Sequence, residues 1–305
     1  MKKIVAMVLV IAMLAIGMAG CKEKTDYTVG VCQLMKHESL DAATQGFCDA
    51  LKAEAEKAGK TVDIQVEVAG EANLCTTVIS TFTAKNVDLI MANATPAVLA
   101  AANATATIPV LGTSVTDYKD TFKGNIPANV SGTSDAVPFD EQAKMMIETL
   151  GLQAGDQVGV LYCTNESNSK IQYDAVKALF EAEGIQVKAY TFSETNQLQT
   201  VVTGMAGECK AVYVPSDNTV AANDAIVGTI CNEKKVPVYT SYGGAVSYAC
   251  LAIDYYQLGY ETGLMAAKIL LEGKSPADIQ IATLTPTKTY NKELCQQLGI
   301  TVPAE

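Results

Sequence analysis

From residue 27 onward, short apolar runs alternate with longer segments in which apolar residues recur at helical spacing. The apolar runs have the length of strands, and the longer segments carry helix start and stop signals, such as Ser39 before and Gly59 after the first of them. In the first half we expect strands at 27–33, 62–68, 87–92, 108–113 and 129–133, and helices at 39–58, 73–85, 96–104 and 138–150. In the second half we expect strands at 157–163, 185–191, 210–214, 236–240, 249–253 and 279–284, and helices at 167–183, 194–206, 219–234, 255–272 and 291–298.

Continuously apolar strands that alternate with long helices indicate parallel sheets buried on both faces. The pattern runs through two successive sets, which predicts an α/β protein with two Rossmann-like, doubly wound lobes joined by hinge crossovers. We expect the N-terminal lobe to comprise residues 27–135 and 255–278. The C-terminal lobe is then expected to comprise residues 136–254 and 279–305.

The N-terminus has the pattern of an export signal. Two lysines precede an apolar stretch at 4–16, and small residues lead from it to Cys21. The apolar stretch is shorter than the roughly 20 residues that a transmembrane helix needs, so we expect a signal peptide at 1–20 rather than a membrane span. Its end resembles a bacterial lipobox, which implies lipidation of Cys21, a lipidated tether at 21–26, and an extracytoplasmic protein anchored to the outer face of the plasma membrane.

Composition narrows the chemistry that the chain can perform. The formal net charge is −11, and an acidic surface argues against nucleic acid as a partner. There is no Arg and no Trp, and His37 is the single histidine. One histidine excludes a multi-histidine metal site and argues against a Ser-His-Asp triad, so we expect no metal, no cofactor and no catalytic residues. Without a guanidinium group, an anionic ligand must be held by Lys, hydroxyls, backbone N–H groups or a helix N-terminus.

Nine cysteines are present, and eight remain when Cys21 is set aside. An even number in an exported chain is compatible with disulfides. Their spacing has no small-domain pattern, no CxxC occurs, and several lie in apolar contexts, such as Cys32, Cys163 and Cys250. We therefore favour buried free thiols, with disulfides as the alternative.

Polar segments follow the predicted strands, at the edge where parallel α/β sheets bind ligands. Each of them is also suited to cap a helix, which is the simpler interpretation of any single one. Because six such segments come from both lobes, we expect them to face one cleft. The candidate binding residues in and around them are Gln33, Glu38, Asn93, Thr95, Thr113, Ser114, Tyr162, Asn165, Glu166, Asn168, Asp217, Asn218 and Tyr242.

Several of these segments, in order along the chain, resemble a family of ABC-transporter solute-binding lipoproteins of the tryptophan/tyrosine type. The resemblance covers about residues 27–300 and departs from the family at Glu38 and Tyr118, where prolines are usual. It implies a type I periplasmic-binding-protein fold, and a monomer that closes on a small solute and docks on an ABC permease. The segments that carry it are HESLDAATQGFCDAL at 37–51, VDLIMANATPAVLAAANAT at 87–105, IPVLGTSVTD at 108–117, NVSGTSD at 129–135, VGVLYCTNESNS at 158–169, AVYVPSDNTVA at 211–221 and AIDYYQLGYETG at 252–263.

On this basis we hypothesise that the cleft binds an amino-acid-like, aromatic zwitterion. Both of its charges need partners, because an unpaired buried charge is costly. The carboxylate is assigned to Thr95, Thr113 and Ser114, and the ammonium to Asp217 first and Glu166 second. The remaining roles are hydrogen bonds from Asn165, Asn168 and Asn218, a further wall from Gln33 and Glu38, and ring packing on Tyr162 and Tyr242.

Three rival interpretations remain open. Asp217 and Glu166 could form the acid/base pair of a hydrolase, although no nucleophile elbow, metal cluster or P-loop accompanies them. The same fold could bind a sugar or nucleoside, against which the absence of Trp and Arg counts. The chain could also be a ligand sensor that acts on a membrane receptor instead of an importer component.

Overall fold

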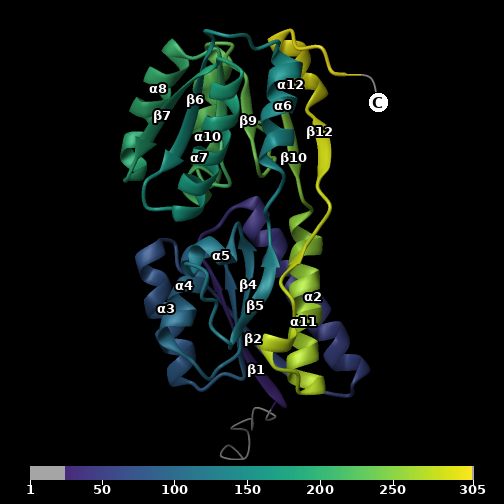
Figure 1. Cartoon of the computed structure of the whole chain (residues 1–305). Helices are drawn as coiled ribbons and strands as arrows, with labels where there is room; N and C mark the ends of the chain where they lie inside the picture. The colour runs from purple at the N-terminus through teal and green to yellow at the C-terminus, as the bar shows by residue number, and fades with distance from the viewer. Residues whose placement is uncertain (1–24, 304–305) are drawn as a thin grey trace, which may run out of the picture.

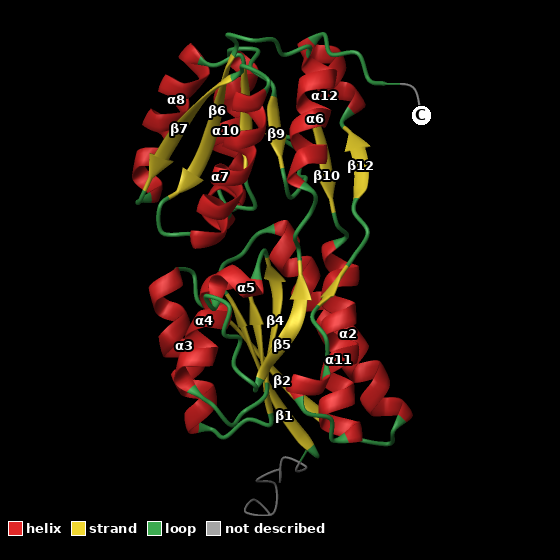
Figure 2. Ribbon diagram, in the orientation of Figure 1, coloured by secondary structure: helices red, strands yellow, loops and turns green. Residues whose placement is uncertain are grey.

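The computed structural model describes residues 25–303, which form two α/β lobes stacked end to end (Figures 1 and 2). The first lobe has a six-stranded parallel sheet in the order β11-β5-β4-β3-β1-β2. Its strands are β1 (Tyr27–Gln33), β2 (Val62–Val68), β3 (Leu89–Asn93), β4 (Val110–Val115), β5 (Val130–Ser134) and β11 (Ala282–Thr283). The order β2-β1-β3-β4-β5 is the doubly wound arrangement, with its switch point between β1 and β3.

The second lobe repeats this order in the parallel sheet β7-β6-β8-β9. Its switch point therefore lies between β6 and β8. The strands are β6 (Gln157–Cys163), β7 (Gln186–Phe192), β8 (Ala211–Val214) and β9 (Val238–Thr240). An antiparallel pair, β10 (Ala249–Ala252) and β12 (Thr287–Tyr290), completes the lobe beside β9. The predicted two-lobed α/β fold with parallel sheets is confirmed.

Helices cover both faces of each sheet (Figure 2). In the first lobe, α2 (Glu38–Lys57) and α11 (Tyr255–Glu272) pack on one face around Phe47 and Leu51. The other face is covered by α3 (Cys75–Ala84) and α4 (Thr95–Ala104) around Ile79 and Phe82, with α5 (Tyr118–Thr121), η1 (Ala72–Leu74) and η3 (Pro276–Asp278) as short additions. In the second lobe the helices are α6 (Phe139–Leu150), α7 (Ser167–Ala182), η2 (Thr195–Gln197), α8 (Leu198–Glu208), α9 (Asn218–Ala221), α10 (Asp224–Glu233) and α12 (Lys292–Leu298).

The chain crosses between the lobes three times, after β5, after β10 and after β11. The third crossing corrects one expected boundary. The sequence predicts residues 279–305 in the second lobe, but β11 pairs with β5 of the first lobe, and the Ser131 hydroxyl donates to the Ile279 carbonyl at 2.7 Å. The expected helix at 219–234 is also corrected, because it is divided into α9 and α10.

All eight cysteines of the described residues are buried free thiols, as the sequence favours. Between residues 25 and 303, no helix has a stretch both long and apolar enough to span a bilayer. The expected signal peptide, the expected lipidation site Cys21 and most of the expected tether lie outside the described residues.

Candidate functional site

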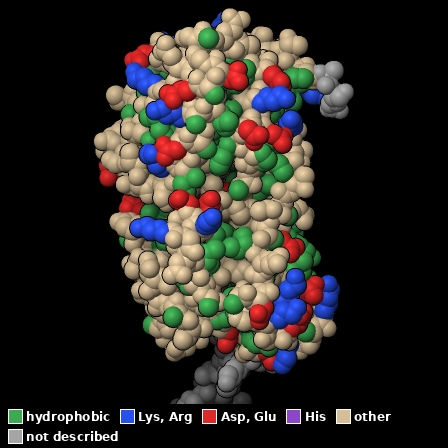
Figure 3. Space-filling view, in the orientation of Figure 1, with side chains coloured by type: hydrophobic (Ala, Val, Ile, Leu, Met, Phe, Trp, Pro, Cys, Tyr) green, Lys and Arg blue, Asp and Glu red, His purple; other side chains and the backbone are tan. Residues whose placement is uncertain are grey.

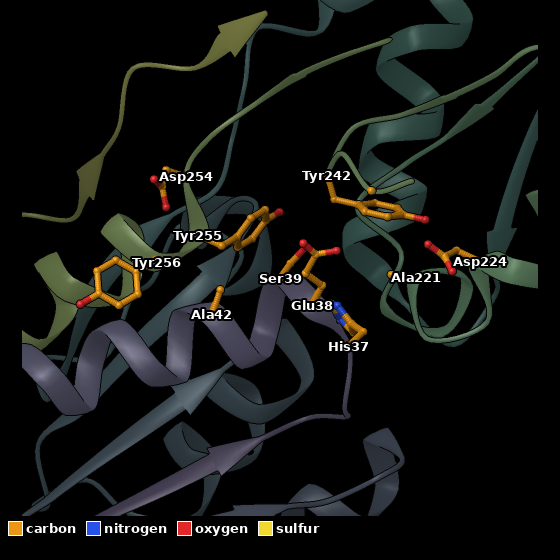
Figure 4. Close-up of a pocket in the computed structure, with 11 residues that line it drawn as sticks. His37, Glu38, Ser39, Ala42, Ala221, Asp224, Tyr242, Asp254, Tyr255 and Tyr256 are labelled. Atoms are coloured by element: carbon orange, nitrogen blue, oxygen red, sulfur yellow. The ribbon is translucent and has the colours of Figure 1, made fainter. Parts of the chain in front are cut away.

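The strands of both sheets point their carboxyl ends toward the boundary between the lobes (Figure 2). A narrow cavity lies there, between Ser39, Ser114 and Asp135 of the first lobe and Ser216, Asn218 and Tyr242 of the second, with Tyr255 at the crossing. A wider cavity of about 230 Å³ shares Tyr242 and Tyr255 with it and is lined also by Glu38, Asp224 and Asp254 (Figure 4). A third interlobe cavity, of about 460 Å³, is lined by Glu71, Glu166 and Glu194 among others.

The lobes touch each other around these cavities. The His37 Nε2–H donates to the Asn218 side-chain oxygen at 3.3 Å, and the Gln172 amide donates to the Thr116 hydroxyl at 3.3 Å. Burial lowers the pKa of His37, which favours the neutral ring. On the face shown in Figure 3, side chains of the two lobes meet along the boundary. The structure therefore corresponds to a closed arrangement of the lobes.

The first-lobe wall offers neutral hydrogen-bond donors. Ser114 lies at a register shift in β4 with φ of +55°, which is unusual for a residue with a side chain, and its buried hydroxyl has no partner among the described residues. Helix α2 begins beside it, and its N-cap residue His37 makes no side-chain cap bond. The first-turn N–H groups of α2 lack helical partners and carry the positive end of the helix dipole. This wall is therefore suited to a ligand carboxylate.

Asp135 supplies the one buried negative group with a free oxygen in the narrow cavity. It follows β5, and the residue is only 6% exposed. Its Oδ2 accepts a hydrogen bond from the Tyr255 hydroxyl at 3.1 Å, while its Oδ1 has no partner among the described residues. Burial raises the pKa of Asp135, because the charged form is poorly solvated there. A cationic group placed at Oδ1 would remove that penalty.

Asp217 and Glu166 are bonded within the second lobe instead. Asp217 accepts from the N–H groups of Cys163 and Val220 at 2.7 and 2.9 Å and from the Ser169 hydroxyl at 2.8 Å. Glu166 accepts from the N–H groups and side chains of Asn218 and Thr219 at 2.6–2.9 Å, and from the Asn168 amide at 3.2 Å. Burial, and then the neighbouring Glu166, raise the pKa of Asp217. These bonds tie the loops after β6 and β8 together, which is a structural role.

Comparison with known proteins agrees with this two-lobed geometry. Residues 28–305 match the family described as ABC transporter substrate binding protein. The chain belongs to this family. The substrate-binding protein is 36% identical over 281 residues to the tyrosine-binding protein of Clostridioides difficile strain R20291, with 88% of this chain and 80% of that protein covered.

Two solved structures clarify the arrangement of its lobes. An ABC domain from Streptococcus pneumonia in complex with L-Trp is 31% identical, with a TM-score of 0.81 and coverage of 91% of this chain and 96% of the other. The ligand-free, open structure of a substrate-binding protein with adhesive properties from Clostridium difficile is 34% identical at the same coverages, with a TM-score of only 0.67. The open structure has a lower TM-score than the L-Trp complex although its sequence identity to this chain is higher. This difference agrees with a closed arrangement of the lobes in the present protein.

The expected binding residues of this substrate-binding protein fall into four groups. Ser114, Asp217, Asn218 and Tyr242 line the narrow cavity, Glu38 lies at the wider one, and Asn165 and Glu166 line the third. The others line none of the three. They are Gln33 and Asn93, which bond to α2, Thr95, which is buried at the start of α4, Thr113, which is buried near the end of β4, Tyr162, which packs on Tyr173 in the second-lobe core, and Asn168, which donates to the Ser216 carbonyl.

Sequence reasoning missed Asp135 and Tyr255 as site residues. Both lie where the chain crosses between lobes, one directly after β5 and the other at the start of α11. The signal was present, because Asp135 ends a polar strand-end segment that carries the family resemblance. The acidic residues at the second-lobe strand ends, Asp217 and Glu166, carry the same local signal.

We expect Glu166→Ala to lower the free energy of unfolding by about 2 kcal/mol, because it leaves the buried N–H groups of Asn218 and Thr219 without their acceptor. Urea unfolding followed by far-UV circular dichroism measures the change. Glu183→Ala is the control, since that side chain is exposed at the end of α7 and accepts no side-chain hydrogen bond in the structure. Equal midpoints for the two variants would contradict the structural role of Glu166.

Proposed function

We propose that this substrate-binding protein captures an aromatic amino acid, tyrosine or tryptophan, between its lobes and delivers it to an ABC permease. The observation that carries the proposal is the free Oδ1 of buried Asp135, placed in one cavity with the neutral donors of Ser114 and the α2 N-terminus. An ammonium pairs with the first and a carboxylate with the second. Because the narrow cavity has a volume of only about 10 Å³, the rest of the ligand is assigned to the wider cavity of about 230 Å³. The names of the tyrosine-binding relative and of the L-Trp complex support the same class of ligand.

The ligand ring is assigned to the space beside Tyr242 and Tyr255, which line both the narrow and the wider cavity (Figure 4). Aromatic side chains stack on one another or meet edge to face, which favours an aromatic ligand over an aliphatic one. Asp135 and Ser114 belong to the first lobe and Asn218 and Tyr242 to the second. A ligand that contacts both lobes binds the closed state more tightly and so shifts the population toward it.

The rest of the proposal concerns the place of the protein in the cell. We propose that residues 1–20 direct export, that Cys21 is lipidated, and that the monomeric protein works on the outer face of the membrane as a carrier without enzymatic activity. The pattern of residues 1–21 and membership of a transporter family support this assignment.

We expect tyrosine or tryptophan to stabilise the chain from residue 22 onward, which contains all described elements of both lobes. At about one hundred times the dissociation constant, linkage adds about 2.7 kcal/mol to the free energy of unfolding. Thermal unfolding and calorimetry measure it, and because the chain has no Trp, the fluorescence of bound tryptophan can be followed directly. Glucose and adenosine are the comparison ligands; stabilisation by one of these, and by no aromatic amino acid, would replace the proposal with a sugar or nucleoside carrier.

A further inference from the structure

Each of the three cavities between the lobes has acidic side chains in its lining. The narrow cavity contains Asp135 and Asp217, the wider one Glu38, Asp224 and Asp254, and the third contains three glutamates. No Lys lines any of these three cavities, and the sequence has no Arg. Lys36, the neighbour of His37 in sequence, is exposed and is not a lining residue. A cleft lined by charges of one sign attracts a ligand group of the opposite sign.

The two ends of a zwitterionic ligand therefore meet unequal partners. The ammonium meets the carboxyl group of Asp135, whose Oδ1 is buried and has no partner among the described residues. The carboxylate meets only dipoles, namely the Ser114 hydroxyl and the N–H groups that begin α2. Burial lowers the pKa of His37, which disfavours a positive charge on its ring. The surrounding carboxylates also repel a ligand carboxylate, while they attract the ammonium.

We propose that the same site also binds aromatic monoamines, the decarboxylated counterparts of its amino acid. The inference rests on the proposed function, since it uses the same ring subsite and the same ammonium partner. A ligand without the carboxylate loses its hydrogen bonds to the neutral donors, but it is also no longer repelled by the surrounding carboxylates. Loss of the ligand ammonium leaves Asp135 buried without a counter-charge, which is the costlier change.

Calorimetric titration of the chain from residue 22 with two matched series of three compounds tests the proposal. The first series is tyrosine, tyramine and 3-(4-hydroxyphenyl)propionate, and the second is tryptophan, tryptamine and indole-3-propionate. In the series whose amino acid binds, we expect the dissociation constant of the amine to lie within about tenfold of that of the amino acid. The acid without an amino group should bind at least about a hundredfold more weakly than the amino acid. An amine that loses as much affinity as the acid would overturn the proposal.

Ionic strength gives a second, independent readout. An amine carries a net charge of +1 and the amino acid none, so added salt should weaken the amine several-fold and the amino acid much less. A salt response of the amine no larger than that of the amino acid would overturn the electrostatic argument. Failure of the proposed function gives a different result: an amine that binds when no aromatic amino acid does would overturn the proposed function and leave the amine as the ligand of the site. Failure of all six compounds would overturn both proposals.

Discussion

Asp135→Asn is expected to weaken binding of the aromatic amino acid by at least about a hundredfold, or about 2.7 kcal/mol, while it stabilises the ligand-free protein. The affinity falls because the ligand ammonium loses its buried negative partner, and removal of one member of such a pair costs 2–5 kcal/mol. The ligand-free protein gains stability because a buried charge is removed whose desolvation outweighs its hydrogen bonds. Calorimetry measures the first effect and urea unfolding the second.

The gain in stability should depend on pH with a defined sign. Burial raises the pKa of Asp135 above its ordinary value of 3.8, so the folded state holds the proton more tightly than the unfolded state. The free energy of unfolding that this bound proton contributes is fully present below about pH 3.8 and is lost as the pH rises through the folded-state pKa of Asp135. The asparagine variant does not titrate there, so its advantage over the wild type should grow with pH across that window and then level off.

Glu148→Gln is the matched control for the binding measurement. It also replaces a carboxylate by an amide, but the Glu148 side chain is 64% exposed on the outer helix α6. We expect its affinity and stability to stay close to those of the wild type. An Asp135→Asn variant that binds like this control would remove Asp135 from the site, and one that is less stable than the wild type would show that the Asp135 charge is compensated inside the protein.

The contrast between Asp135 and Asp217 shows what a sequence can reveal about such a site. Both carboxylates follow strands and lie at the same boundary between the lobes, and the strand-end rule finds that place from sequence. Whether a side chain is free for a ligand depends on its partners. The Ser169 and Cys163 groups that bond Asp217 are 48 and 54 residues away in sequence, and no local pattern indicates them.

The dependence on partners distant in sequence also explains two other differences between the predictions and the structure, at β12 and at Tyr162. Buried parallel strands such as β1 and β3 are predictable because nearly every position in them is apolar. The polar strand β12, Thr287–Tyr290, has no such signal, because it gains its structure by pairing with β10. Tyr162 was placed in the cleft from its position near a strand end, but it alternates with Leu161 and Cys163, and its ring faces the core on the α7 side.

Gly259→Ala is expected to lower the free energy of unfolding by about 3 kcal/mol. Gly259 lies in α11 where that helix crosses α2, and an added Cβ would overlap the carbonyl oxygen of Ala43 and lie 2.6 Å from its carbonyl carbon and 2.7 Å from its Cα. Those atoms are backbone and cannot rotate away, so the whole helix pair must separate, and overpacking of this kind costs about 1–3 kcal/mol or more. We take the upper part of that range because Gly46 and Gly263 allow close approach at the same interface.

The control substitution is Gly204→Ala in α8, where no atom lies within 4 Å of the added Cβ. There the alanine should stabilise the protein by up to about 1 kcal/mol, because alanine favours the helix more than glycine does. Urea unfolding of both variants measures the difference, with opposite shifts of the midpoint expected. An unchanged midpoint for Gly259→Ala would contradict the close packing of α2 on α11. Helix α2 also places His37 and Ser39 in the lining of the narrow cavity. Because Gly259→Ala moves α2 away from α11, this variant should also bind the ligand more weakly, whereas Gly204→Ala should leave binding unchanged.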